Sequence, residues 1–400
     1  MIITPSIRTN FFTNAHPIGC KKVIERQILE AKANDPFKGP KNVLIIGGSS
    51  GYGLASRIAL AYGAKANTVN VSFESAPRGK RTGSAGWWNN VWFQHFARET
   101  GNQHKDFLGD AFSFETKELV LNYVKETFGT LDLIVYSLAA GVRKNHETGE
   151  TVRSQIKTIG APAVGKTIDI ATLSVYNLEV EPATPQEVDD TVYVMGGGDW
   201  QDWVTYFEQH GALAEGFKTI AYTYVGGPTT EAIYRGGSMG KAKEDLEAKA
   251  RSMNQMLQDK YHGEALISSS KAVVSKASVF IPQMPIYVAC LYDVMSHHGV
   301  HETILEHKYR LFADMVYGTK RLVDDQNRIR LDHFEMDDAI QDETMTLMNS
   351  LTDEDVMNLP GTEHFLTEFF QINGFKIDGI DYEADVDIDD LVERYKPEGY

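Results

Sequence analysis

Residues 43–53 read Val43-Leu44-Ile45-Ile46-Gly47-Gly48-Ser49-Ser50-Gly51-Tyr52-Gly53, an apolar run that ends in a glycine-rich turn. Four consecutive apolar residues predict a strand that is buried on both faces, as in a parallel sheet. Residues 54–63 carry small side chains on one face and predict a helix. A strand, a glycine turn and a helix in this order predict the first unit of a Rossmann-type α/β fold.

The rest of the chain continues this alternation. The pattern predicts strands over 68–74, 131–136, 217–224 and 266–270, and helices over 117–128, 240–257 and 281–295. Residues 143–185 mix polar and β-branched side chains, and we expect them to form an excursion over the sheet edge. The acidic stretch from about residue 322 onward is expected to form helices around the core. The expected fold is thus a doubly wound parallel sheet.

No linker rich in proline, glycine or serine divides the 400 residues, which favours a single large domain. We expect a nucleotide-binding core over about 40–290 and a helical C-terminal decoration over about 300–400. The N-terminal, mid-chain and C-terminal decorations are expected to form a lid over the substrate.

The composition excludes several classes of protein. Lysine and arginine number 39 and aspartate and glutamate 55, and the net charge of −16 argues against nucleic acid as a partner. A hydrophobic content of 42% excludes wholesale disorder. The two cysteines, Cys20 and Cys290, do not form a disulfide framework, and no 18-residue apolar run or signal peptide is recognisable. We therefore expect a cytoplasmic globular protein that does not associate with membranes.

The glycine turn has the spacing of a dinucleotide site. Gly47 permits a sharp turn, Gly51 lets the backbone approach a pyrophosphate, and Gly53 lets the helix pack closely on the strand. The helix N-terminus then offers free N–H groups to the phosphates. The alternative is an ordinary structural turn. The residues predicted to contact the cofactor here are Gly47, Gly48, Ser49, Ser50, Gly51, Tyr52 and Gly53.

Phe73 and Glu74 close the second predicted strand and are also predicted cofactor contacts. Glu74 lies about 20 residues past the turn, where an acidic side chain hydrogen-bonds the adenosine ribose. Its carboxylate would repel a 2′-phosphate, which favours NADH over NADPH. The alternatives are a solvated glutamate and a 2′-phosphate held by the basic residues that follow, Arg78, Lys80 and Arg81.

Residues 160–167 match the P-loop pattern G-x4-G-K-T. A P-loop follows an apolar strand and begins a helix. Residues 153–157 are too polar for a central strand, and residues 167–170 begin a helix poorly. We therefore interpret this match as fortuitous.

The catalytic residues are sought among tyrosine and lysine pairs. Hydride-transfer enzymes on this kind of sheet commonly use Tyr-x3-Lys, and no tyrosine of this chain has a lysine four residues later. Tyr234 and Lys243 instead form a Tyr-x8-Lys pair with three glycines between them. The glycines permit a loop that brings both side chains to one point. Tyr224 lies just upstream.

Seven stretches, in this order, resemble the FabV-type enoyl-[acyl-carrier-protein] reductases and the trans-2-enoyl-CoA reductases. The resemblance covers essentially the whole chain. The stretches are 14–20, 47–55, 109–113, 135–139, 194–197, 233–235 and 281–287. The chain departs from the family at residues 140–143, which lack a usual proline, at Trp87-Trp88 in place of Trp-Tyr, and at Gly198-Asp199 in place of Glu-Asp. These departures concern substrate preference more than the reaction.

The resemblance implies NADH-dependent reduction of the 2,3-double bond of trans-2-enoyl thioesters of acyl-carrier protein or CoA, in fatty-acid synthesis. It implies that Tyr234 is the proton donor, that Lys243 holds the nicotinamide ribose and that Tyr224 contacts the thioester carbonyl. It further implies a monomer. The remaining cofactor contacts it implies are Asp110 and Ala111 at the adenine, Leu138 and Ala139 at the middle, and Val273, Val274 and Ser275 at the nicotinamide half. The histidines at 297, 298, 301 and 307 do not form an HExxH pattern, so we expect no metal site.

The expected chemistry agrees with these residue types. Hydride addition to C3 places negative charge on the thioester oxygen, and a tyrosine O–H aimed at that oxygen stabilises the charge as it develops. A neighbouring lysine is expected to lower the pKa of the phenol. The alternatives are a core tyrosine at 234, a 3-ketoacyl reductase on the same sheet, and a non-catalytic nucleotide-binding protein. The predicted helix 281–295 is either a wall of an acyl pocket or a core helix.

Overall fold

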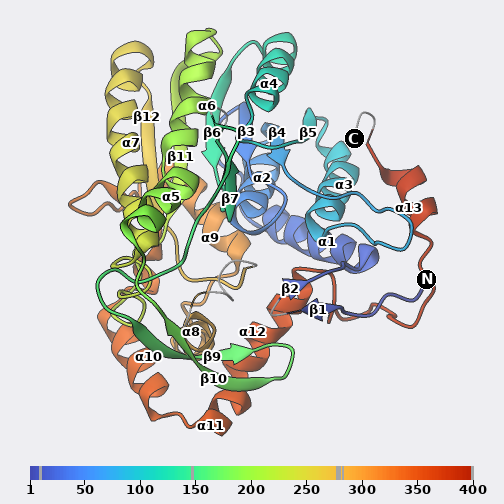
Figure 1. The fold of residues 1–400 in the computed structure, drawn as a ribbon. Helices are drawn as coiled ribbons and strands as arrows, with labels where there is room; N and C mark the ends of the chain where they lie inside the picture. Colours follow the sequence, from blue (N-terminus) through green and yellow to red (C-terminus); the bar gives the residue numbers. More distant parts are fainter. Residues whose placement is uncertain (9–10, 146–147, 276–280, 282, 398–400) are drawn as a thin grey trace.

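A seven-stranded parallel sheet forms the centre of the computed structural model, which describes residues 1–8, 11–145, 148–275, 281 and 283–397 (Figure 1). The strand order is β13-β12-β11-β6-β3-β4-β5, and every neighbouring pair is parallel. The doubly wound α/β fold predicted from the sequence is confirmed. The strands are β3 (Asn42–Ile46), β4 (Asn67–Ser72), β5 (His104–Leu108), β6 (Leu131–Tyr136), β11 (Leu213–Thr223), β12 (Glu264–Ser269) and β13 (Arg328–Arg330).

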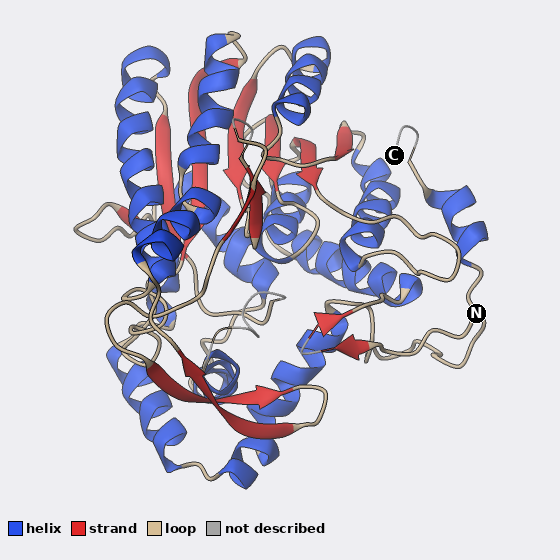
Figure 2. Cartoon of the chain, in the orientation of Figure 1, coloured by secondary structure: helices blue, strands red, loops and turns tan. Residues whose placement is uncertain are grey.

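Helices cover both faces of this sheet (Figure 2). Along β3, Val43 and Ile45 face one core, and Leu44 and Ile46 face the other. The uninterrupted apolar run of this strand is therefore a consequence of burial on both sides. The first core contains α1 (Pro17–Ala33), α2 (Gly51–Gly63), α3 (Ala85–Ala97) and α9 (Ile304–Arg310); the second contains α4 (Phe114–Thr127), α6 (Gly198–Gln209) and α7 (Ser238–Tyr261).

A group of helices lies beyond the carboxyl ends of the strands, together with an antiparallel ribbon (Figure 1). Ile168 of the ribbon packs with Ile286 and Cys290 of α8 and with Val356 of α11. These elements are β9 (Ala163–Asp169), β10 (Ser174–Val180), α8 (Met284–His297), α10 (Asp338–Ser350), α11 (Asp353–Asn358) and α12 (Pro360–Gln371). The remaining elements are β1 (Ile7–Arg8), β2 (Phe11–Phe12), η1 (Arg98–Thr100), β7 (Val142–Lys144), β8 (Thr151–Arg153), α5 (Pro185–Met195), η3 (Leu311–Val316), η4 (Leu331–Phe334) and α13 (Ile388–Tyr395).

The structure corrects the predicted strands and the predicted mid-chain excursion. The strand predicted over 68–74 ends at Ser72, so Phe73 and Glu74 belong to the following loop. Strands β5 and β13 were not predicted, because the polar, partly exposed edge strand β5 and the three-residue β13 show no apolar run. The excursion expected over the sheet edge forms two hairpins, and β9–β10 packs on α8 and α11 instead.

Candidate functional site

The glycine turn between β3 and α2 has the geometry of a phosphate cradle. Gly47 has a φ of +88°, and a Cβ on it would lie 2.2 Å from the carbonyl oxygen of Ser137. A Cβ on Gly53 would lie 2.2 Å from the carbonyl oxygen of Gly47. Gly51, with a φ of +55°, has open space at its Cβ position. Ser50 is the N-cap residue of α2, and its side chain forms no capping hydrogen bond with the helix. The first N–H groups of the helix therefore remain available to an anion.

Glu74 is held beside this turn. One carboxylate oxygen accepts a hydrogen bond from the Ser49 hydroxyl at 2.6 Å, and the other accepts one from the Ser84 hydroxyl. A Cβ on Gly86 would lie 1.9 Å from Oε1 of Glu74, so only glycine leaves room for the carboxylate. Phe73, next to it, is 84% exposed. The structure therefore holds the Glu74 carboxylate next to the glycine turn, where the sequence predicted that it contacts the adenosine ribose.

The other predicted cofactor residues follow the carboxyl ends of neighbouring strands. Asp110 and Ala111 follow β5, and the Asp110 carboxylate caps the turn by accepting from the Phe112 N–H at 3.0 Å. Leu138 and Ala139 follow β6, and residues 273–275 follow β12. In a parallel sheet the carboxyl ends of the strands form one edge, where ligands of this fold bind. The predicted residues thus line one continuous edge from β5 to β12.

Tyr234 and Tyr224 are brought together by the turn between β11 and α7. Their ring centroids lie 5.0 Å apart at an angle of 86°, and both side chains are buried. Burial raises the pKa of Tyr234 to about 12, while Arg235 opposes this shift. The expected lowering of the phenol pKa is therefore wrong, because the effect of burial outweighs that of the nearby cation, which is Arg235 and not a lysine.

Lys243 lies near the start of α7, and its Nζ donates to the carbonyl oxygen of Tyr222 at 3.3 Å. Burial lowers the pKa of this ammonium to about 8, against the opposing effect of Glu247. Among the described residues the ammonium makes this single hydrogen bond, which leaves N–H groups for a ligand hydroxyl. The residues present therefore fit the ribose of a nicotinamide nucleotide.

Glu335 is a site residue that sequence analysis missed. It follows η4, is fully buried, and accepts hydrogen bonds at Oε1 from the hydroxyls of Tyr224, 3.1 Å, and Tyr287, 2.7 Å. Its Oε2 accepts from the N–H of Ala272 at 2.6 Å. Burial raises the pKa of Glu335 to about 7, and the hydrogen bond from Tyr287 opposes the shift. No local pattern in the acidic C-terminal stretch distinguishes this glutamate from its solvated neighbours.

Lys308 of α9 is a second buried charge that the sequence did not indicate. Its Nζ donates to the Ser270 hydroxyl at 2.6 Å and lies 3.6 Å from the ring centroid of Tyr222 and 4.2 Å from that of Tyr52. Tyr52 in turn donates to the carbonyl oxygen of Lys271. The start of α2 is thereby tied to the segment that leads to Val273.

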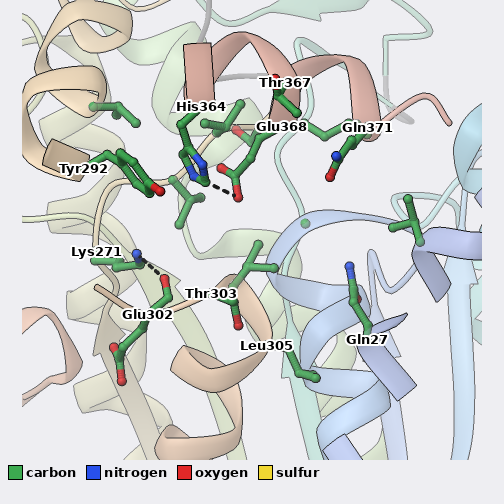
Figure 3. A pocket seen from close by; sticks show the side chains of 18 of the residues that line it. Gln27, Lys271, Tyr292, Glu302, Thr303, Leu305, His364, Thr367, Glu368 and Gln371 are labelled. Carbon is green, nitrogen blue, oxygen red and sulfur yellow. Dashed lines mark hydrogen bonds and ion pairs between the residues drawn. The ribbon is translucent and has the colours of Figure 1, made fainter. Parts of the chain in front are cut away.

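A cavity of about 460 Å³ adjoins the turn (Figure 3). Ser50 and Gly51 line it together with residues 273–275, whereas Tyr224, Tyr234 and Lys243 do not. In Figure 3, His364 and Glu368 lie side by side on α12, with 3.5 Å between Nε2 and Oε1, and Lys271 donates to the carbonyl oxygen of Glu302 at 2.5 Å. Residues of α8 line the apolar side, Val288, Leu291 and Met295. The helix predicted over 281–295 begins at Met284. Its side chains line this cavity and also pack in the hydrophobic core.

The P-loop match does not form a phosphate cradle. Its second half lies in strand β9 of the antiparallel ribbon, and the Lys166 ammonium pairs with Asp353 at 2.6 Å on the surface.

His297, His298 and Glu343 lie close enough to share an ion, but all three are exposed. Among the described residues, no helix combines the length and apolarity that crossing a membrane requires.

Three sequence families match the chain. They are described as the NAD(P)H binding domain of trans-2-enoyl-CoA reductase, over residues 2–79, the trans-2-enoyl-CoA reductase catalytic region, over 81–317, and the enoyl reductase FAD binding domain, over 323–386. Together they span nearly the whole chain.

Similar proteins align over their full length. An enoyl-[acyl-carrier-protein] reductase [NADH] of Photobacterium profundum is 44% identical, with 98% of this chain and 99% of the relative covered. A trans-2-enoyl-CoA reductase [NADH] of Clostridium acetobutylicum is 41% identical, with 99% and 100% covered. Crystal structures of the trans-2-enoyl-CoA reductases of C. acetobutylicum with NADH and Treponema denticola with NAD superpose with TM-scores of 0.96 and 0.91, at 41% and 42% identity. They cover 99% and 96% of this chain and 100% and 98% of their own.

The residues present do not fit the FAD named in the third description. A dinucleotide is held by a strand that leads through a glycine turn into a helix, and the described residues 323–386 contain no such unit. Gly361 and Gly374 serve packing, because added Cβ atoms would lie 1.9 Å from the Ala289 carbonyl oxygen and 2.4 Å from that of His16. This segment instead contributes Glu335 to the site.

Proposed function

Because the chain belongs to the family of NADH-dependent enoyl-[acyl-carrier-protein] reductases and trans-2-enoyl-CoA reductases, we propose that it reduces the 2,3-double bond of trans-2-enoyl thioesters with NADH. The observation that carries the proposal is the buried pair of Tyr234 and Tyr224, together with Lys243, whose ammonium donates to the carbonyl oxygen of Tyr222, at the strand edge that also carries the glycine turn.

Each residue has a defined task in this reaction. NADH, when bound, supplies the hydride that adds to C3 of the enoyl group. Tyr234 donates a hydrogen bond to the thioester oxygen, where the negative charge of the enolate collects. Its proton then passes to the enolate, and the saturated thioester forms once this hydrogen is on C2. Tyr224 contacts the same carbonyl. Lys243 holds the hydroxyls of the nicotinamide ribose with its free N–H groups.

The other predicted contacts place the rest of the cofactor. The turn 47–53 binds the pyrophosphate, Glu74 binds the adenosine ribose, and Asp110 and Ala111 line the adenine. Phe73, Leu138 and Ala139 complete the adenosine half and the middle of the site, and Val273, Val274 and Ser275 receive the nicotinamide half. Support comes from their common position at the carboxyl ends of β3, β4, β5, β6 and β12.

The high pKa of Tyr234 is compatible with this task. A phenol with a pKa of about 12 stays protonated at neutral pH and is therefore ready to donate. Glu335 positions Tyr224 by accepting a hydrogen bond from its hydroxyl group, which fixes the direction of the tyrosine side chain.

The proposal extends to the whole polypeptide. The three matched segments act as one enoyl-reductase domain, with the core over about 40–290 and the helical decoration over about 300–400, and the decorations form the substrate lid. We further propose a cytoplasmic monomer that serves fatty-acid synthesis, and sedimentation analysis tests the oligomeric state.

The test is NADH oxidation, followed by absorbance, with crotonyl-CoA, a longer trans-2-enoyl-CoA and the matching enoyl-acyl-carrier protein. We expect turnover with at least one of the three. Acetoacetyl-CoA is the control for the 3-ketoacyl reductase alternative. Turnover of acetoacetyl-CoA alone would overturn the proposal.

A further inference from the structure

A second cavity, of about 800 Å³, opens beside the adenosine end of the proposed cofactor site. It is lined by residues of the β1–β2 hairpin, of the loop after β4 and of the end of α12. Its charged lining residues are three arginines, Arg8, Arg78 and Arg81, and no carboxylate lines it among the described residues. In a chain with a net charge of −16, this cavity is a local concentration of positive charge that attracts anions.

The three guanidinium groups are available to a ligand. Each is exposed, and none forms an ion pair within the described part of the chain. The structural arginines behave differently, because Arg57 pairs with Asp106 at 2.7 Å and Arg235 with Glu247 at 2.9 Å. Guanidinium groups without an internal partner suit phosphate, which they bind in a bidentate manner.

The loop holds two of these arginines close together. The backbone N–H of Arg78 donates to the carbonyl oxygen of Arg81 at 3.1 Å, and the reciprocal hydrogen bond has the same length. This tight turn fixes Arg78 and Arg81 on adjacent parts of one short loop. Arg8 approaches the same cavity from the N-terminal hairpin. Cations from two separate segments therefore converge on one space.

The cavity borders the proposed ribose position. Ser84 lines the cavity and donates its hydroxyl to Glu74, and the N–H of Ser75 donates to the Ser84 oxygen at 3.1 Å. Phe11, whose side chain is 53% exposed, also lines the cavity. The arginines of this cavity therefore lie next to the position proposed for the adenosine ribose.

We propose that this cavity is a subsite for the phosphate monoester on the ribose of an adenosine nucleotide. The inference rests on the proposed function, because the CoA thioesters proposed as substrates carry this group, as does NADPH, the phosphorylated counterpart of NADH. CoA carries it on the 3′-oxygen of its ADP end, and NADPH carries it on the 2′-oxygen. A thioester of pantetheine lacks it.

The first experiment measures binding by calorimetry and does not depend on catalysis. The probes are adenosine 3′,5′-bisphosphate, adenosine 2′,5′-bisphosphate and adenosine 5′-monophosphate. We expect at least one bisphosphate to bind about tenfold more tightly than the monophosphate, since an additional charge-assisted contact has this order of effect. The combined variant Arg8→Ser, Arg78→Ser and Arg81→Ser should lose this preference, and the exposed Arg251→Ser on α7 should keep it. Equal binding of all three probes, or a preference that survives in the triple variant, would overturn the proposal.

The second experiment identifies the source of the phosphate. If it belongs to CoA, the triple variant should lose about tenfold in kcat/KM with crotonyl-CoA and remain unchanged with crotonyl-pantetheine. If it belongs to NADPH, the loss should appear with NADPH and not with NADH. A loss confined to the acyl-carrier-protein substrate would overturn the proposal in favour of a protein-docking surface. Absence of turnover in the wild-type chain would instead count against the proposed function. The calorimetric binding result would still test the phosphate subsite, because it does not depend on turnover.

Discussion

The carboxylate of Glu335 accepts a hydrogen bond from the hydroxyl of Tyr224 at 3.1 Å, although the two residues are 111 positions apart in the chain. The second carboxylate oxygen of Glu335 accepts from the N–H of Ala272, which directly precedes Val273. One buried acid therefore connects the proposed carbonyl contact to the segment proposed for the nicotinamide. Movement of Glu335 would disturb both.

Glu335→Gln should lower kcat about tenfold and change the KM for NADH little, because glutamine keeps the volume but presents an amide where two tyrosine hydroxyls donate. Steady-state kinetics measure the split between kcat and KM. Glu335→Asp, which keeps the charge, should recover part of the loss. Equal kcat values for Glu335→Gln and wild type would remove Glu335 from the positioning role.

The same variant should change how stability depends on pH. The pKa of Glu335 rises from 4.5 in its ordinary state to about 7 on folding, so the folded chain binds the proton more strongly. Its contribution is fully present below pH 4.5 and is lost as the pH rises through 7. Between pH 5 and pH 8 the wild type should lose up to about 3 kcal/mol of unfolding free energy relative to Glu335→Gln. Urea unfolding at both pH values tests this, and parallel changes in the two proteins would contradict it.

Tyr234→Phe should reduce turnover of an enoyl-CoA at least a hundredfold and leave NADH binding nearly intact, because only the proton donor is removed. Stopped-flow turnover and fluorescence titration of NADH measure the two effects. Tyr123→Phe, a half-buried tyrosine of α4, is the matched control. Activity within a few-fold of wild type would assign the proton to another group.

Lys243→Met should weaken NADH binding as well as turnover, because the ammonium is proposed to hold the ribose. In the wild type, kcat/KM should fall above about pH 8, where this ammonium loses its proton. The pH profile of kcat/KM, which reports the free enzyme, is the measurement. A profile that stays flat to pH 9.5 would show that the charge of Lys243 is not required. Lys241→Met, at an exposed position of the same helix, is the control.

Glu74→Ala should reduce the preference for NADH over NADPH about tenfold, because the carboxylate that repels a 2′-phosphate is removed. Gly86→Ala should act in the same direction, since the new Cβ would meet Oε1 of Glu74 at 1.9 Å and displace it. Gly141→Ala, with open space around it, is the control. The ratio of kcat/KM values for the two cofactors is the readout. Unchanged ratios in both variants would show that Glu74 does not determine the preference for NADH over NADPH.

Much of the fold and part of the site could be predicted from short-range pattern. The strand 43–46, the glycine turn and the helix α2 are specified within about 20 residues, because burial on both faces and the phosphate turn impose a local pattern. The pair Tyr234 and Lys243 came from spacing and from a resemblance. The edge strands β5 and β13 were missed, because short or half-exposed strands do not need an apolar run.

By itself the sequence determined the parallel α/β sheet, the position of the phosphate turn and the family, since each depends on the order of residues along the chain. Only the tertiary structure decided which distant groups meet: Glu335 with Tyr224, Lys308 with Tyr222, and Arg8 with Arg78 and Arg81. It also decided that burial raises the pKa of Tyr234, although a lysine nearby in sequence was expected to lower it. The physical reason is that burial and charge depend on what surrounds a group in three dimensions, whereas strand and turn patterns depend on its immediate neighbours in the chain.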